Sequence, residues 1–150
     1  MACDSVCELK PCSFSGVYQP SLMDAFPNGK VLLLSYFYDR VTPLLTVDSS
    51  PDHPQPPMKI STIATLARLV CAGRDSWTEN WGEYPEVMDE LEGRPEWCLD
   101  LSFQHALLVL GYEFGDDREV QLGKRIEGTE LGWCLGATIA MVGGELRCRV

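Results

Sequence analysis

An apolar run that ends in aromatic, acidic and basic side chains is the first feature of this sequence that could do chemistry. Val31–Leu34 is apolar, and the next six residues, Ser35–Arg40, read Ser-Tyr-Phe-Tyr-Asp-Arg. An apolar, aromatic-rich run bounded by turn signals is typical of a buried strand. Ligands of open α/β sheets bind at the carboxyl ends of strands. We therefore interpret Ser35–Arg40 as a candidate binding site. The alternative is a buried strand whose end only reaches solvent.

Turn signals define the element that would position this site. Pro27–Gly29 precedes the apolar run and Thr42–Pro43 follows it, so we expect one strand over Val31–Arg40, in the middle of an α/β sheet. Residues 47–58 hold four prolines and are expected to form an exposed loop rather than a domain boundary. The 150 residues, 45% of them hydrophobic, suffice for one domain with a core.

Helical periodicity predicts two long helices. Over 62–72 the apolar residues recur at helical spacing, with Ser61 or Thr62 as the expected cap and Gly73 as the expected end. The second long helix spans 97–111 and is apolar over more than half its circumference, so we expect it to be well buried.

The rest of the chain predicts shorter elements. Between the long helices we expect two short helices, with a break at Gly82, a second start near Pro85 and a solvated acidic face. Further along we expect a short helical turn from Asp116 through Gly123, an extended piece over 125–127, and a last helix over 129–142 with Thr129 as its cap.

Common catalytic and phosphate-binding motifs are absent from the sequence. It contains no GxxxxGK[ST] or GxGxxG loop, and no GxSxG or HExxH. His105 could pair with a cysteine, but its Leu-rich helix favours a partly buried packing residue. Among 22 acidic residues a glycosidase carboxylate pair carries almost no information. The net charge of -10 disfavours nucleic-acid binding and leaves a small nucleotide open.

The number of cysteines and the first residues of the chain indicate different cellular compartments. Seven cysteines is a high count for this length, yet paired CxxC motifs are absent and only two histidines are present, so a zinc site is not expected. The count favours an oxidising compartment. The first residues, Met1–Asp4, lack the basic and apolar regions of a signal peptide, and no segment has the ~20 apolar residues of a membrane helix. The conflict would resolve if the chain were the C-terminal part of a longer secretory protein.

Several motifs, read together, resemble the apyrase-type nucleoside di- and triphosphatase family, and are most similar to its Golgi guanosine diphosphatases. They are Cys12–Pro20 (Cys-Ser-Phe-Ser-Gly-Val-Tyr-Gln-Pro), Ser35–Arg40, Cys98–Phe103 ahead of Gly111-Tyr112, and Glu130–Ala137 (Glu-Leu-Gly-Trp-Cys-Leu-Gly-Ala). Their order and spacing match from about Cys7 to Val142. The resemblance implies an α/β fold that is the C-terminal portion of an actin-like, ribonuclease H-like lobe, with a short sheet and packed helices. Residues 1–150 would then be a single partial domain.

The resemblance also implies a reaction. Family members hydrolyse nucleoside diphosphates such as GDP and UDP to the monophosphate and phosphate, by metal-assisted attack of water with Ca or Mg bridging the phosphates. Two Gly-rich phosphate loops and the glutamate that activates the water have no match in this sequence. We therefore assign no catalytic residue and no metal ligand to this chain, and expect it to supply the nucleoside side of the cleft and to be inactive alone.

Five residues carry the nucleoside assignment by resemblance. In the family an aromatic after the central strand stacks on the base, and Tyr38 is the best match, with Tyr36 second. Ser35 and Asp39 are expected to contact ribose or base. Arg94, ahead of the second long helix, is expected to cover the other face of the base.

The resemblance also implies two disulfide pairs and a cellular location. Disulfides between Cys7 and Cys12 and between Cys71 and Cys98 match family pairs, while the roles of the other three cysteines stay open. The implied location is the lumen of the Golgi or secretory pathway, with membrane attachment only through a missing N-terminal anchor. Two alternatives stay open: a non-catalytic remnant, and a disulfide-stapled interaction module without activity.

Overall fold

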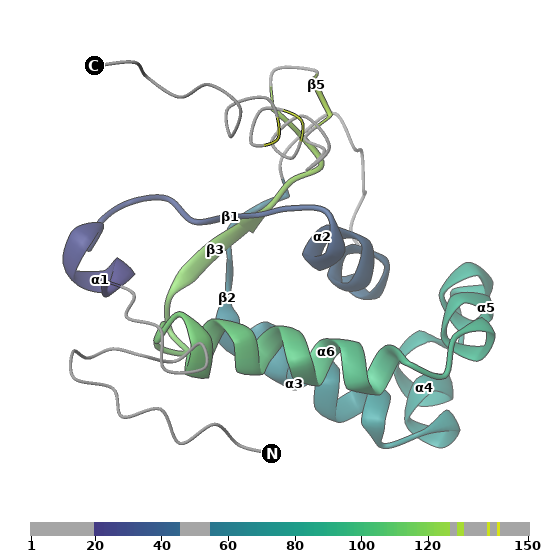
Figure 1. The fold of residues 1–150 in the computed structure, drawn as a ribbon. Coiled ribbons are helices and arrows are strands. Elements are labelled where there is room, and N and C mark those ends of the chain that lie inside the picture. The colour runs from purple at the N-terminus through teal and green to yellow at the C-terminus, as the bar shows by residue number, and fades with distance from the viewer. Residues whose placement is uncertain (1–19, 46–54, 127–128, 131–137, 139–140, 142–150) are drawn as a thin grey trace, which may run out of the picture.

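The computed structural model describes residues 20–45, 55–126, 129–130, 138 and 141. Their elements form a short sheet packed on helices, an α/β arrangement (Figure 1). The expected Cys7–Cys12 bridge, most of the 47–58 loop and most of the expected last helix lie outside these residues. Within the described residues, no helix has the length and apolar character needed to cross a membrane.

The main sheet has three strands in the order β1-β3-β2. β1 (Leu32–Leu33) runs parallel to β3 (Glu119–Leu122), with Leu32 opposite Gln121. β2 (Met58–Lys59) runs antiparallel to β3, with Met58 opposite Val120. A separate antiparallel pair is formed by β4 (Arg125–Ile126) and β5 (Thr129–Glu130).

The strand expected over Val31–Arg40 is confirmed only at its start. β1 ends at Leu33, and the chain then turns into the helix α2 (Tyr36–Val41), which continues into the 3-10 turn η1 (Thr42–Leu45). Tyr38 and Val41 are its buried residues, three positions apart. That spacing puts both on one helix face, and in a strand they would point to opposite faces. The sequence expectation was therefore wrong for the second half of this run.

Before β1 lies the one-turn helix α1 (Leu22–Ala25), in which the Ser21 side chain accepts a hydrogen bond from the Asp24 amide. The first long helix, α3 (Ile60–Cys71), begins two residues earlier than expected and has no side-chain cap. Its first amides are satisfied by the loop before β3. Ile60 N donates to Arg118 O at 3.1 Å and Ser61 N donates to Asp116 O at 2.9 Å. Backbone carbonyls thus replace the expected hydroxyl cap.

The helices after α3 follow the sequence closely. Gly73, at φ 90°, ends α3, and a break at Gly82 separates α4 (Arg74–Trp81) from α5 (Pro85–Gly93). The acidic residues of 83–92 are exposed, as expected. The second long helix is α6 (Trp97–Ala106), which continues into a π-helical turn, η2 (Leu107–Gly111).

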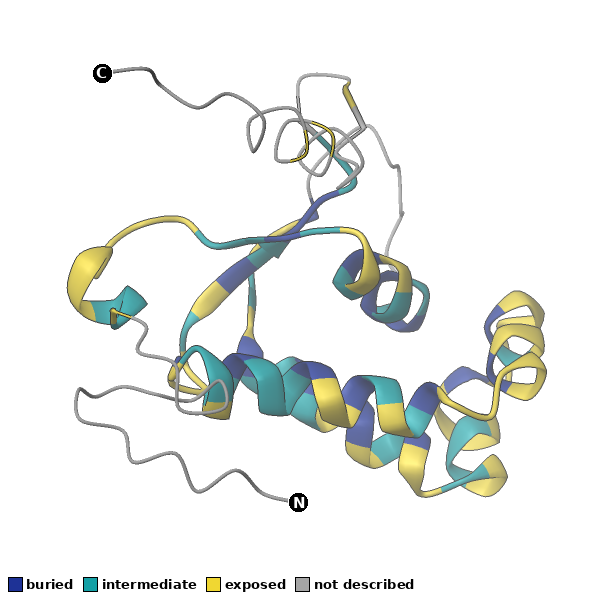
Figure 2. Cartoon of the chain, viewed as in Figure 1, coloured by how far each residue is buried: buried dark blue, intermediate teal, exposed yellow. Residues whose placement is uncertain are grey.

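Helix α6 lies side by side with α3 (Figure 1), and Cys71 and Cys98 form a disulfide between the two, as the resemblance implied. The expectation that 97–111 is buried on most sides was wrong. One stripe packs on the core, and the opposite side is exposed (Figure 2); its exposed large apolar residues are Leu99, Phe103 and Leu110.

Two expectations near the C-terminus were wrong. The expected helical turn from Asp116 through Gly123 is instead β3, whose Val120 and Leu122 are buried at alternating positions between two partner strands. Thr129 does not cap a helix but belongs to β5. The extended piece expected over 125–127 is confirmed for its first two residues as β4.

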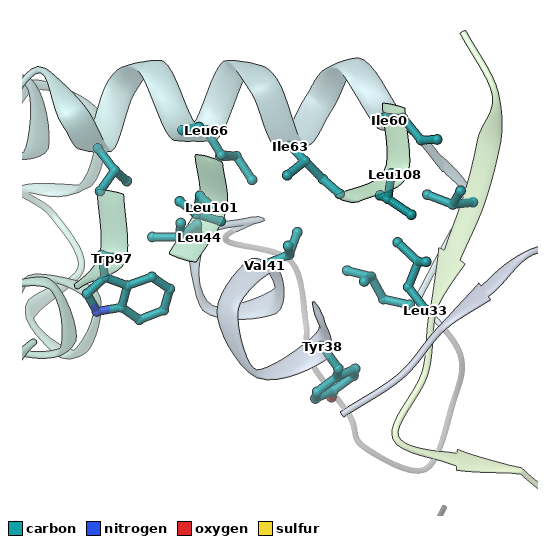
Figure 3. Packing of buried hydrophobic residues seen from close by; sticks show 14 of the residues in the cluster. Leu33, Tyr38, Val41, Leu44, Ile60, Ile63, Leu66, Trp97, Leu101 and Leu108 are labelled. Carbon is teal, nitrogen blue, oxygen red and sulfur yellow. The ribbon is translucent and has the colours of Figure 1, made fainter. Parts of the chain in front are cut away.

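The end of the Pro-rich segment also differs from the exposed loop that the sequence predicted. Gln55 is buried, and its amide donates to Leu122 O at 3.0 Å. Met58 already belongs to β2. The core itself joins β1 and α2 to the inner faces of α3 and α6 (Figure 3).

Candidate functional site

A tight turn at the carboxyl end of β1 builds the candidate site. Ser35 has φ 48° and ψ -109°, and Phe37 N donates to Leu34 O at 3.1 Å across the turn. These angles are close to the first central position of a type II′ turn, which glycine normally occupies. A serine there stores roughly 1–3 kcal/mol of strain. The turn directs α2 away from the sheet and leaves Ser35 exposed.

The two tyrosines of α2 have different environments. Tyr38 is 7% exposed and packs into the core near Leu33 (Figure 3), whereas Tyr36 is 37% exposed. A planar ligand needs an accessible ring face for stacking, so Tyr36 offers the larger surface of the two.

A buried ion pair fixes α2 against α6. Arg40 Nε lies 2.6 Å from Asp100 Oδ2, and the two side chains are 17% and 16% exposed. The Arg40 guanidinium carbon lies 5.0 Å from the centroid of the Trp97 ring and 5.8 Å from that of Tyr36, both within cation–π range. The arginine therefore joins the exposed tyrosine to the buried tryptophan.

The same pair acts on the Tyr36 hydroxyl. Partial burial raises the pKa of Tyr36 to about 12, with the hydrogen bond to Asp100 and its negative charge adding to the rise and Arg40 opposing it. Tyr36 therefore stays a neutral phenol at physiological pH. Its backbone carbonyl accepts a 2.8 Å hydrogen bond from Nε2 of the fully buried Gln104, which ties the first turn of α2 to α6 a second time.

A second, more open ion pair lies at the same end of β1. Lys124 Nζ lies 3.5 Å from Asp39 Oδ1, with side chains 38% and 54% exposed, and 6.0 Å from the centroid of the Tyr38 ring. Lys124 follows Gly123, whose amide donates to Leu33 O at 3.0 Å. A Cβ at Gly123 would lie 3.0 Å from Leu32 Cδ1, so a larger residue at this position would require the Leu32 side chain to shift.

The structure brings four of the five expected nucleoside-binding residues together: Ser35, Tyr36, Tyr38 and Asp39 all lie in the turn or on α2. Arg94 belongs to the connection between α5 and α6, and its ion-pair partner in the described part of the chain is Glu90, at 3.8 Å.

Sequence reasoning missed several residues of this site. Asp100 and Gln104, one helical turn apart, pack on the buried side of a Leu-rich helix; a polar pair on an apolar face was a readable signal for buried polar contacts. Lys124 had no such signal, because its pairing with Asp39 depends on how β3 lies beside β1.

The acids, histidines and cysteines of the described ranges do not form a metal site. No three of them gather in a way that could hold an ion. His105 is half-buried, as expected, and its Nε2 lies 2.9 Å from Asp116 Oδ1. The described residues therefore offer no cluster of three such donor groups for Ca or Mg.

Comparison with known proteins identifies relatives of this chain. Residues 1–146 match the model of the GDA1/CD39 (nucleoside phosphatase) family. The chain is 43% identical over 149 residues to a probable guanosine-diphosphatase of Aspergillus fumigatus, covering 98% of this chain and 28% of that protein. It is 38% identical to the guanosine-diphosphatase of Saccharomyces cerevisiae, covering 98% and 27%.

More distant relatives share the same region. The chain is 31% identical over 135 residues to ectonucleoside triphosphate diphosphohydrolase 2 of Mus musculus, covering 88% of this chain and 24% of that protein. The chain thus spans about a quarter of the length of the relatives it matches. Since the family match runs over almost all of its residues, the chain belongs to the GDA1/CD39 family of nucleoside phosphatases.

Proposed function

We propose that the carboxyl end of β1 is the nucleoside-contacting wall of a nucleoside diphosphatase site that takes GDP and UDP. The observation that carries this proposal is the exposed Tyr36 ring on α2, with Ser35 in the turn before it and Asp39 three residues after it, in a chain of the nucleoside phosphatase family. Base stacking on an aromatic ring tolerates different bases, which suits a diphosphatase with more than one substrate.

The roles of the residues in the turn and on α2 follow from their exposure, and that of Arg94 follows from the family resemblance. Tyr36 is the stacking platform, because its ring is accessible and its hydroxyl and carbonyl are both held. The buried Tyr38 supports the wall from beneath. Ser35 and Asp39 present a hydroxyl and a carboxylate to the ribose or base, and Arg94 covers the other face of the base.

The phosphate chemistry is proposed to lie outside these 150 residues. When bound, Ca or Mg would neutralise phosphate charge and fix its geometry. This chain's residues bind and orient the nucleoside and exclude water from one face of the base. We therefore propose that the chain alone releases no phosphate.

The lumen of the Golgi or secretory pathway is the proposed location. The Cys71–Cys98 disulfide supports it, because such bonds persist in oxidising compartments.

The test is to titrate GDP and UDP into the chain, with Ca or Mg present, and to measure binding by calorimetry and phosphate release by a colorimetric assay. Stacking is worth about 1–3 kcal/mol per base, so Tyr36→Ala should weaken binding about 5- to 150-fold. Tyr84→Ala is the matched control, because Tyr84 is 39% exposed and lies between α4 and α5. Equal weakening by both variants would contradict the assignment, and turnover that Tyr36→Ala abolishes would contradict the absence of activity.

A further inference from the structure

We propose that the outer edge of β1 and the apolar groove beside it bind an extended segment of a partner protein, which adds a strand antiparallel to β1. The segment would carry apolar side chains at alternate positions and an acidic side chain opposite Lys30. This surface begins ahead of β1, whereas the proposed nucleoside wall lies at the carboxyl end of that strand.

β1 is an edge strand whose outer backbone groups are available for pairing. Among the described strands it pairs with β3 alone. Val31 O accepts a hydrogen bond from a β3 amide at 2.9 Å, and Leu33 O accepts one from Gly123 N at 3.0 Å. Backbone groups of successive residues in a strand point to opposite sides. The amide and carbonyl of Leu32 therefore point to the outer edge, where a second chain can pair with them.

The chain ahead of β1 continues this alternation. Arg118 donates from both terminal nitrogens to the turn before β1, and one of them binds Gly29 O. Gly29 O is thus held on the β3 side, like Val31 O. The intervening Lys30 turns its amide and carbonyl to the outer edge, as Leu32 does. Together the two residues offer two amides and two carbonyls to a partner strand.

An apolar groove lies along the same edge. It is a cavity of about 580 Å³ between α1, β1 and η2, a size typical of ligand pockets. Among its lining residues, Leu33, Leu108 and Phe114 are buried, whereas Phe26 is 63% exposed. The groove therefore connects the core to the surface directly beside the unpaired edge, and an added strand would cover it.

The geometry of strand pairing sets the side-chain pattern of the partner. Residues directly opposite each other in paired strands have their side chains on the same face. Leu33 faces the core (Figure 3), so partner side chains opposite Val31 and Leu33 would enter the groove and should be apolar. Partner side chains opposite Lys30 and Leu32 would lie on the other face.

Lys30 sets the charge of the partner. It lines the groove, is exposed and has no ion-pair partner in the described part of the chain. An acidic side chain opposite it would form an ion pair. A second copy does not supply one, because an antiparallel β1 centred on Leu32 places Leu34 opposite Lys30. The net charge of -10 also opposes self-association, so the partner is a different protein.

The probe is the peptide Thr-Val-Thr-Leu-Glu-Val-Thr with an N-terminal fluorophore. Its third residue pairs with Leu32, its glutamate lies opposite Lys30, and its apolar side chains enter the groove. Fluorescence anisotropy with the wild-type chain should show saturable binding. Phe26→Ala should weaken this binding, and Leu99→Ala should not, because Leu99 is similarly exposed, at 69%, but does not line the groove.

Backbone methylation of the peptide tests whether a strand forms. N-methylation of its third residue removes the amide that pairs with Leu32 O. The loss of this hydrogen bond alone should weaken binding about 2- to 13-fold. N-methylation of the fourth residue should leave the affinity unchanged, because that amide points away from β1.

A charge exchange tests the position opposite Lys30. The wild-type chain should prefer the glutamate peptide over its lysine counterpart by about 1.4- to 5-fold, as expected for an exposed pair. Lys30→Glu should reverse this order. Lys59→Glu is the matched control, because Lys59 is an exposed lysine of β2, at the other edge of the sheet, and it should keep the wild-type order.

Four results would overturn the proposal and leave the nucleoside wall standing. They are no saturable binding of the glutamate peptide, equal effects of the two N-methyl groups, an unchanged order in Lys30→Glu, and a dimer that the peptide does not dissociate. Analytical ultracentrifugation of the chain with and without peptide measures the last of these. A dimer of that kind would show that a second copy occupies the edge.

Discussion

Neutralising Asp100 should both destabilise the fold and change the titration of Tyr36. Asp100→Asn leaves the Arg40 guanidinium in a mostly buried position without its counter-charge, and neither paired atom has a further hydrogen-bond partner within the described residues. Breaking a buried pair by removing one partner costs about 3–5 kcal/mol. The Asp117→Asn change in the exposed Lys59 pair should cost at most about 1 kcal/mol.

The pH dependence follows from the raised pKa of Tyr36. In the folded chain this tyrosine keeps its proton up to about pH 12, while its ordinary value is 10.0. Between these values the unfolded chain binds fewer protons, so stability falls as pH rises through this window. Asp100→Asn removes one hydrogen bond and one negative charge, so the pKa of Tyr36 should fall. The pH range over which stability falls should then become narrower.

Urea unfolding at neutral pH and an ultraviolet titration of tyrosine ionisation measure these two effects. A double-mutant cycle with Arg40→Met isolates the pair from other effects of each substitution. The reasoning is refuted if Asp100→Asn costs no more stability than Asp117→Asn, or if the pKa of Tyr36 does not move.

Two further predictions concern the turn and the disulfide. Ser35→Gly should stabilise the chain by about 1 kcal/mol, because glycine adopts φ 48° without strain, whereas Ser35→Ala should not. Thermal unfolding compares the two variants, and equal unfolding midpoints would show that the turn is unstrained. Replacing Cys71 and Cys98 by serine should lower the free energy of unfolding by about 3 kcal/mol, because the bridge joins residues 27 positions apart and constrains the unfolded chain. Urea unfolding of the oxidised wild-type chain and of the variant measures this difference, and intact mass before and after reduction confirms the bridge. Unchanged stability would contradict this contribution.

The sequence predicted the helices well and the site's local structure poorly. Helix α3 was predicted from the i, i+3, i+4 pattern of 62–72, and the bounds of α4 and α5 from the glycines and proline of 73–85. These signals are local in the sequence, so they can be read without knowing the tertiary structure. The run after Leu34 contains residues typical of strands, and its helix depends on the Ser35 turn and on the core that receives Tyr38 and Val41. Tertiary packing outweighed local propensity there.

The same distinction explains the candidate site. Ser35, Tyr36 and Asp39 were identified because they follow an apolar run. Lys124 was not, because its place beside Asp39 depends on the parallel pairing of β1 with β3. The difference in exposure between Tyr36 and Tyr38 likewise could not be predicted, because it depends on α2 being a helix.

Amide hydrogen exchange with and without GDP tests the central claim most directly, because it locates the nucleotide on the chain. We predict that GDP protects amides of Ser35–Arg40 and of the Gly123–Lys124 turn, and leaves α4 unchanged. Protection confined to other elements, or no protection anywhere at GDP concentrations that saturate binding, would contradict a nucleoside wall at the carboxyl end of β1.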